Sequence, residues 1–91
     1  MLFVIRCIDK KNHLSVRQEN RPAHVEYLKS FGEKLFAAGA ILDDDEQMCG
    51  SVVIIDVADR AESDAFAAGD PYYKAGLFAE RTIDRWNKVL P

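Results

Sequence analysis

Two stretches of the chain carry apolar side chains at most of their positions. They are residues 2–8 (LFVIRCI) and residues 51–57 (SVVIIDV), and both are rich in β-branched residues. That composition predicts β-strands. Successive side chains of a strand point to opposite faces, so both faces of each of these strands would be largely apolar. Such strands are typical of a sheet that is covered on both sides.

Apolar positions at helical spacing predict a first helix over residues 21–38. Asn20 suits the N-cap, Pro22 falls just inside the first turn, and Gly39 suits the C-cap. The polar segment before it, residues 9–20, would form a loop. One stripe of the helix would face the sheet, and it consists of His24, Leu28, Phe31, Leu35 and Ala38.

The remaining elements complete an alternating pattern of strands and helices. Residues 40–44 predict a short strand, Asp59 can cap a second helix over 60–68 that Gly69 ends, and residues 78–89 predict a last strand. The order is β-α-β-β-α-β. This order predicts an α+β, ferredoxin-like fold, in which two helices cover one face of a four-stranded antiparallel sheet.

The face of the sheet without helices needs a cover, because the two apolar strands expose hydrophobic side chains there. A second copy of the chain is the simplest cover, so we expect a homodimer with its sheets packed face to face. The 91 residues are enough for a single domain, 1–91, with a modest core. Extra burial in an oligomer would therefore help stability.

Charge and hydropathy exclude several classes of partner. The net charge is −3, which argues against a nucleic-acid or anionic-membrane surface. The strands also lack the aromatic pattern of RNA-binding modules with this fold. No apolar run approaches the roughly 18 residues of a membrane-spanning helix, and no basic region precedes the first apolar stretch as in a signal peptide.

The two cysteines, Cys7 and Cys49, are far apart and form no CxxC motif. They cannot hold an iron–sulfur cluster, and zinc would need more ligands. We expect free thiols in a reducing, cytoplasmic environment. No phosphate loop, dinucleotide fingerprint or metal motif is present, so we expect no cofactor and no metal. A haem or oxygenase role stays open, although a single histidine is weak support for it.

His24 is the first candidate for chemistry, since histidine exchanges protons near neutral pH. It would lie in the first turn of the first helix, on the stripe that faces the sheet. Asp70 would lie at the end of the second helix. The two helices are roughly antiparallel in this fold, so these ends can be neighbours. A carboxylate would fix the tautomer of the imidazole. The alternatives are a core histidine with a backbone partner, and an aspartate that only caps the turn at Pro71; one carboxylate can serve both roles.

Four further side chains are candidates for a binding pocket. Ser51 follows a glycine at the start of a strand, where its hydroxyl can meet a ligand. Tyr72 and Tyr73 can supply aromatic walls, or they can simply pack. Arg6 can bind an anion or form an ion pair with Asp56, and the ion pair is the favoured interpretation. His13 lies in the polar segment and is expected to be solvated, and Trp86 is expected in the core or at an interface.

Several motifs together resemble the YciI-related (YCII domain) family over almost the whole chain. They are RPAHVEYL (21–28), FAAGAIL (36–42), GSVVIID (50–56), DPYYKAGLF (70–78) and RW (85–86). The resemblance implies a dimeric α+β barrel of ferredoxin-like units with a pocket around His24 and Asp70, close to Ser51. Two departures affect local shape: Ala40 stands where the family commonly has proline after Ala-Gly, and Arg85 stands where proline commonly precedes the tryptophan.

The resemblance also implies a function. A member of the family acts as a dehydrochlorinase on a chlorinated, hydroxylated aromatic, which suggests lyase or isomerase chemistry here without a cofactor. His24 would be the general acid and base, Asp70 would orient it, and Ser51, Tyr72 and Arg6 would bind a small polar molecule, aromatic or enolisable. Two alternatives stay open: a dimeric module that binds or senses a small ligand without turnover, and a structural domain that docks on other enzymes.

Overall fold

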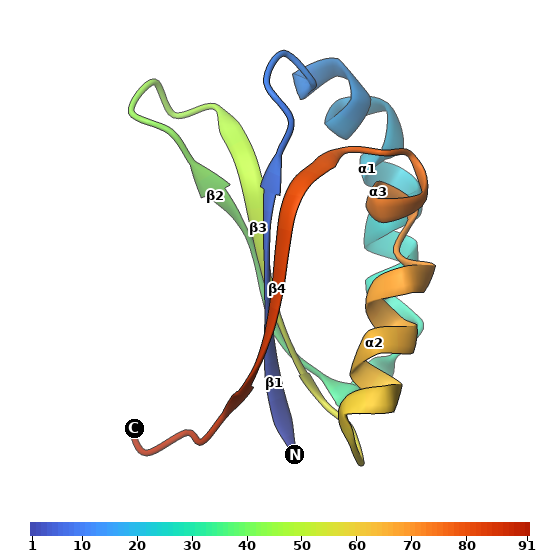
Figure 1. The fold of residues 1–91 in the computed structure, drawn as a ribbon, viewed down its shortest axis with the longest axis vertical. Helices are drawn as coiled ribbons and strands as arrows, with labels where there is room; N and C mark the ends of the chain where they lie inside the picture. The colour runs from blue at the N-terminus through green and yellow to red at the C-terminus, as the bar shows by residue number, and fades with distance from the viewer.

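The computed structural model describes all residues, 1–91, and its elements alternate between strands and helices (Figure 1). In chain order they are β1 (Leu2–Asp9), α1 (Leu14–Lys29), a 3₁₀ turn (Gly32–Lys34), β2 (Leu35–Leu42), β3 (Met48–Asp56), α2 (Arg60–Gly69), α3 (Pro71–Lys74) and β4 (Phe78–Trp86).

The four strands form one antiparallel sheet in the order β2-β3-β1-β4. The two most apolar strands, β1 and β3, are therefore its central pair. Helices α1, α2 and α3 all lie on one side of the sheet, and no helix covers the other side (Figure 1). This confirms the predicted ferredoxin-like α+β fold.

The core lies between the sheet and the helices. Alternate residues of β1, namely Phe3, Ile5 and Cys7, point into it and are buried. Val53 and Ile55 do the same from β3, and the helices contribute residues such as Leu28 and Phe66. The alternate residues of these strands point to the bare face, where apolar side chains including Leu2, Val4, Val52 and Ile54 are only half-buried.

The first helix does not lie where the hydrophobic pattern predicted it. It spans Leu14–Lys29 rather than 21–38, because residues 14–20 contain good helix formers and are helical. Asn20 is inside this helix, and its side chain donates to a backbone carbonyl one turn earlier instead of capping. The helix ends before Gly32, which adopts a φ of 55° that turns the chain toward the sheet.

The second strand begins at Leu35 rather than at residue 40, because α1 has already ended at Lys29. Residues 35–39, predicted as the end of the helix and its cap, form the single strand β2 together with residues 40–42 of the predicted strand. Leu35 and Ala38 are therefore strand residues and Gly39 is no helix cap. β2 pairs with β3 over nearly its whole length. These ladder hydrogen bonds outweigh the helical preference of an alanine-rich segment, since strand formation depends strongly on context.

The second half of the chain follows the prediction closely. The side chain of Asp59 accepts a hydrogen bond from the Glu62 backbone N–H at 2.9 Å and caps α2. The helix ends at Gly69, one residue beyond the predicted range. The last strand, β4, stops at Trp86 rather than at residue 89. No helix of the structure is both long enough and apolar enough to cross a membrane.

Gly50 gives the first test of the fold. A Cβ atom at this position would overlap the backbone carbonyl oxygen of Cys7, so β1 and β3 would have to separate locally. We expect Gly50→Ala to lower the free energy of unfolding by about 1–3 kcal/mol, the usual cost of overpacking. Urea denaturation followed by circular dichroism measures the change.

Gly39→Ala is the matched control, because nothing lies within 4 Å of a Cβ placed there and its φ is not positive. A strand alanine is about 0.5–1 kcal/mol more favourable than glycine, so this variant should be slightly more stable than wild type. Equal effects of the two substitutions would contradict the role of the close β1–β3 approach.

Candidate active site

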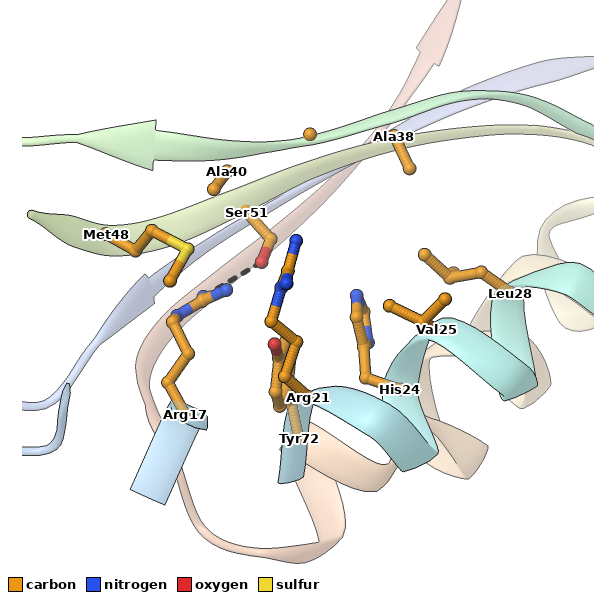
Figure 2. Close-up of a pocket in the computed structure, with 11 residues that line it drawn as sticks. Arg17, Arg21, His24, Val25, Leu28, Ala38, Ala40, Met48, Ser51 and Tyr72 are labelled. Atoms are coloured by element: carbon orange, nitrogen blue, oxygen red, sulfur yellow. Dashed lines mark hydrogen bonds between the residues drawn. The ribbon is translucent and has the colours of Figure 1, made fainter. Parts of the chain in front are cut away.

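A half-open pocket of about 140 Å³ lies between α1 and the helix-covered face of the sheet (Figure 2). Its apolar wall comes from α1, from the small residues of β2 and from Met48. Its polar lining consists of Arg17, Arg21, His24, Ser51 and Tyr72. No carboxylate lines the pocket directly, so the lining is rich in hydrogen-bond donors.

His24 and Asp70 are in direct contact. The Nδ1 atom of His24 lies 2.8 Å from Oδ1 of Asp70, and the two residues are only 7% and 6% exposed. His24 is not in the first turn of its helix, as expected, but beyond the middle of α1. It meets Asp70 because the chain turns at the junction of α2 and α3. The catalytic role of the pair stays a prediction.

The same carboxylate also caps α3. Oδ1 of Asp70 accepts the backbone N–H of Tyr72 at 2.9 Å. The capping role and the histidine contact expected for Asp70 are thus both present. An ionised carboxylate only accepts hydrogen bonds, so Nδ1 of His24 carries the proton and Nε2 is left as an acceptor. Nε2 forms no hydrogen bond within the chain, and the imidazole is directed into the pocket (Figure 2).

Tyr72 fixes the plane of the imidazole. The two rings are stacked, with centroids 3.9 Å apart and an interplanar angle of 17°. The guanidinium carbon of Arg17 lies 4.5 Å from the centroid of the same tyrosine ring, and Tyr72 stands between Arg17 and His24 in Figure 2. Burial raises the pKa of the Tyr72 phenol, and the charges of Arg17 and Arg21 oppose that rise. The hydroxyl is therefore neutral at physiological pH.

Arg17 is a buried cation with two partners. Its Nε and Nη2 atoms donate to the two carboxylate oxygens of Asp9 at 2.7 and 2.9 Å, and Nη2 also donates to Ser51 Oγ at 2.9 Å. Burial by itself lowers the pKa of Arg17, but the hydrogen bond and the charge of Asp9 outweigh it and raise the pKa overall. Since arginine only donates, the hydroxyl proton of Ser51 is free for another acceptor.

Three residues of the site were not predicted from the sequence: Arg17, Arg21 and Asp9. The two arginines share one face of α1 with His24, at the helical spacing of three, four and seven residues. That spacing was hidden because the helix was expected to begin only at residue 21. Asp9 has no local signal, since its partner Arg17 reaches it from another element.

Arg6 is not part of this pocket. It lies on β1 between two core residues and is exposed on the bare face of the sheet, opposite Val52 and Thr82. The ion pair expected with Asp56 is also wrong, because that carboxylate instead contacts the N-terminal amine of Met1 at 2.8 Å. Alternation along the strand explains the first correction, since Arg6 and the neighbouring Cys7 point to opposite faces. Register explains the second, because Asp56 lies opposite Leu2 and Arg6 lies opposite Val52.

Three other aromatic or histidine candidates also lie outside the pocket. Tyr73 is exposed and packs against Arg81, whose guanidinium carbon lies 4.5 Å from the ring centroid. His13 precedes α1, and its ring contacts the backbone oxygen of Lys11. Trp86 lies at the end of β4, partly exposed. No group of three or more potential ligand side chains gathers at one place to hold a metal ion.

Both cysteines are free thiols, as expected. Cys7 lies in the core beneath the site, and burial raises its pKa to about 12, with the charge of Asp70 as the next contribution. The Cys7 thiol is therefore protonated at pH 8, and the thiolate is the reactive form. Cys7 is therefore unsuited to act as a nucleophile.

The different burial of Cys7 and Cys49 predicts that only one of them is alkylated in the folded protein. Iodoacetamide at pH 8 should label the partly exposed Cys49 in the folded protein and leave Cys7 unmodified, because Cys7 is both buried and protonated. Intact-mass spectrometry should show one adduct per native chain and two adducts after unfolding in guanidinium. Modification of Cys7 in the native protein at a rate similar to Cys49 would contradict this environment.

Comparison with known proteins identifies the family. A sequence model of the YCII-related domain family matches residues 1–87. The YciI proteins of Escherichia coli O6:H1 and Shigella flexneri are each 31% identical over 98 residues, which covers 99% of this chain and all of those proteins. The chain therefore belongs to the YCII-related domain family, which confirms the resemblance carried by its motifs.

Solved structures agree with this assignment. The 5-chloro-2-hydroxyhydroquinone dehydrochlorinase of Burkholderia phenoliruptrix, in complex with 2,5-dihydroxybenzoquinone, is 37% identical, with a TM-score of 0.89 over 96% of this chain and 94% of its own. More distant structures share the fold alone. One is an antibiotic biosynthesis monooxygenase (18% identical, TM-score 0.61, 99% and 100% covered). Another is PA3566 of Pseudomonas aeruginosa, which is 11% identical with a TM-score of 0.59 over 98% of this chain and 93% of its own.

Proposed function

We propose that the pocket is the active site of a small enzyme that needs no cofactor and in which His24 is the general acid and base. One observation carries the proposal: Asp70 engages Nδ1 of His24 at 2.8 Å, which leaves Nε2 free as a proton acceptor in the pocket. A buried carboxylate that orients an imidazole in this way also stabilises the imidazolium formed when Nε2 takes a proton.

The substrate we propose is a small, hydroxylated, enolisable ring, and the reaction is a lyase or isomerase reaction. In an elimination, the ring reacts as its keto tautomer, in which the halogen is bonded to a saturated carbon. Nε2 removes a proton from this tautomer, the freed electron pair forms a new double bond, and the halide leaves with the electrons of its bond to carbon. In an isomerisation, the imidazolium returns the proton to another atom of the same molecule. Both reactions balance without an oxidant or reductant.

The other lining residues supply orientation. Ser51 can donate its hydroxyl proton to a ring oxygen of the ligand. In its hydrogen bond with Arg17 the serine oxygen is the acceptor, so the proton is not used there. Tyr72 holds the imidazole plane by stacking. The likeness to the dehydrochlorinase supports this class of reaction, since that protein is 37% identical over nearly the whole chain.

Substitution of His24 tests the catalytic proposal. We expect His24→Ala to lower kcat/KM by about 10²–10⁴-fold on 5-chloro-2-hydroxyhydroquinone, the range typical of a lost general acid or base. Asp70→Asn should also lower kcat, because it removes the negative charge beside Nδ1 while keeping an oxygen to cap α3. Chloride release measured with an ion-selective electrode reports turnover.

His13→Ala is the matched control, since it removes the only other histidine, which lies outside the pocket. It should keep wild-type turnover. Circular dichroism and thermal melts should show that all three variants fold. A fully active His24→Ala enzyme would refute the proposal. A wild-type protein that binds hydroxylated rings but turns over none of a halogenated and enolisable panel would favour a non-catalytic ligand-binding module.

We further propose that the protein is a homodimer in which two sheets pack through their bare faces. The support is the half-buried apolar strip of Leu2, Val4, Val52 and Ile54, which no helix covers. Phe36 and Trp86, both exposed, lie beside each other with ring centroids 6.4 Å apart. Covering such a surface removes apolar area from water. The pocket lies on the opposite side of the sheet, so this contact would leave its mouth open.

Light scattering tests the dimer. Wild type should elute with twice the chain mass of 10.3 kDa. Ile54→Glu should elute with the mass of one chain, because it places a charge in the apolar strip and the interface would have to remove that charge from water. Tyr73→Glu, which adds the same charge to an exposed position of the helix layer, should remain dimeric. A monomeric wild type would exclude this assembly.

A further inference from the structure

The cations around the pocket are not equally neutralised. Arg17 forms two hydrogen bonds with the carboxylate of Asp9, and His24 contacts the carboxylate of Asp70. Arg21 lines the same pocket and forms no ion pair and no side-chain hydrogen bond with any residue of the chain. Arg21 is therefore the one guanidinium of the pocket that no carboxylate neutralises directly.

The position of Arg21 on α1 keeps it unpaired. Its neighbours one turn before and after on the helix surface are Arg17, Gln18, His24 and Val25, none of which is acidic. The residue is exposed, yet its guanidinium is turned toward the sheet (Figure 2), and Arg21 lines the same pocket as Ser51. The charge also acts on the pocket, since it opposes the rise in the pKa of Tyr72.

The polar groups that face the cavity are matched to an anion. The guanidinium of Arg21 offers several N–H donors, and Ser51 keeps one free O–H donor. The carboxylates of Asp9 and Asp70 are both turned away toward their partners. At Arg21 and Ser51 a cationic ligand would meet positive charge and a donor, whereas an oxyanion would find charge-assisted hydrogen bonds there.

The volume of the pocket matches a single ring. Its volume is about 140 Å³, and a cavity of about 150 Å³ in another protein holds one benzene molecule. The stacked pair of Tyr72 and His24 adds a flat wall at one side. A planar six-membered ring with oxygen substituents fits both the volume and the donors.

We propose that the ligand of this pocket is a single-ring oxyanion, a phenolate or an enolate, and that Arg21 selects it over the neutral form. The inference rests on the proposed function, whose substrate class it narrows. Arg21 is then a specificity-determining residue: it binds the ionised ring oxygen, Ser51 donates to the same oxygen or to its neighbour, and the ring lies within reach of Nε2 of His24.

Isothermal titration calorimetry with two probes at pH 7.5 tests the inference. The anionic probe is 2,5-dihydroxybenzoquinone, a vinylogous acid that is ionised at this pH. The neutral probe is hydroquinone under argon, because phenols ionise near pH 10. Wild type should prefer the anion, and Arg21→Gln should weaken its binding by about 10-fold to 100-fold, as expected for a hydrogen bond to a charged group. Hydroquinone binding should change less than about twofold.

Two further variants separate charge in the pocket from charge in general. Arg21→Lys should keep part of the preference, since it retains the cation but loses the planar fork. Lys29→Gln removes the same charge from the last residue of the same helix, outside the pocket, and should bind the anion as wild type does. Raising NaCl from 50 to 300 mM should weaken anion binding by wild type more than by Arg21→Gln.

The inference is overturned if wild type fails to bind the anion, if Arg21→Gln weakens both probes equally, or if Lys29→Gln has the same effect as Arg21→Gln. These measurements need no turnover, so they stand apart from the kinetic test of His24. A chain that binds the anion through Arg21 but never turns over a substrate would support the ligand class and refute the enzyme. A chain that turns over a substrate, but whose preference for the anion does not depend on Arg21, would support the enzyme and refute the proposed role of Arg21.

Discussion

The carboxylate of Asp70 is the interaction on which the site depends. It is almost completely buried, and a buried charge is tolerated only where it is paired and hydrogen-bonded. Its partners come from two elements: the backbone of Tyr72 in α3 and the imidazole of His24 in α1. Satisfying this one group therefore fixes the short helix after α2 against the middle of α1, and it brings the tyrosine ring onto the imidazole.

A second buried pair holds the other side of that ring. Arg17 packs against Tyr72 and binds Asp9, so β1, α1 and α3 meet at one point. Each pair stabilises the position of the other through the shared aromatic ring. The free atoms of the site, Nε2 of His24 and the hydroxyl proton of Ser51, thus belong to side chains whose other ends are already occupied. Such preorganisation is what orientation-dependent proton transfer requires.

The sequence predicted the strands β1 and β3 and the helix α2, because turn, cap and strand signals are local. The contact between His24 and Asp70 is long-range: the order of elements only permitted it, and the resemblance to the YCII-related family implied it. It misplaced α1 because Phe31, Leu35 and Ala38 continue the helical spacing by coincidence after the helix has ended. Only the pairing of β2 with β3 decides between helix and strand there, and that is a long-range property. Arg17 could not be identified as buried, since its burial requires the carboxylate of Asp9 from another element.

Register in the central strand pair keeps the two proposed surfaces apart. Ser51 lies opposite Cys7 on the helix-covered face, whereas Val52 lies opposite Arg6 on the bare face. A slip of one residue would exchange these faces and would turn the serine away from Arg17. Gly50 resists such a slip, because only a residue without a Cβ allows the close approach of the Cys7 carbonyl. The same glycine therefore holds Ser51 in the pocket and leaves the opposite face of the sheet to assembly.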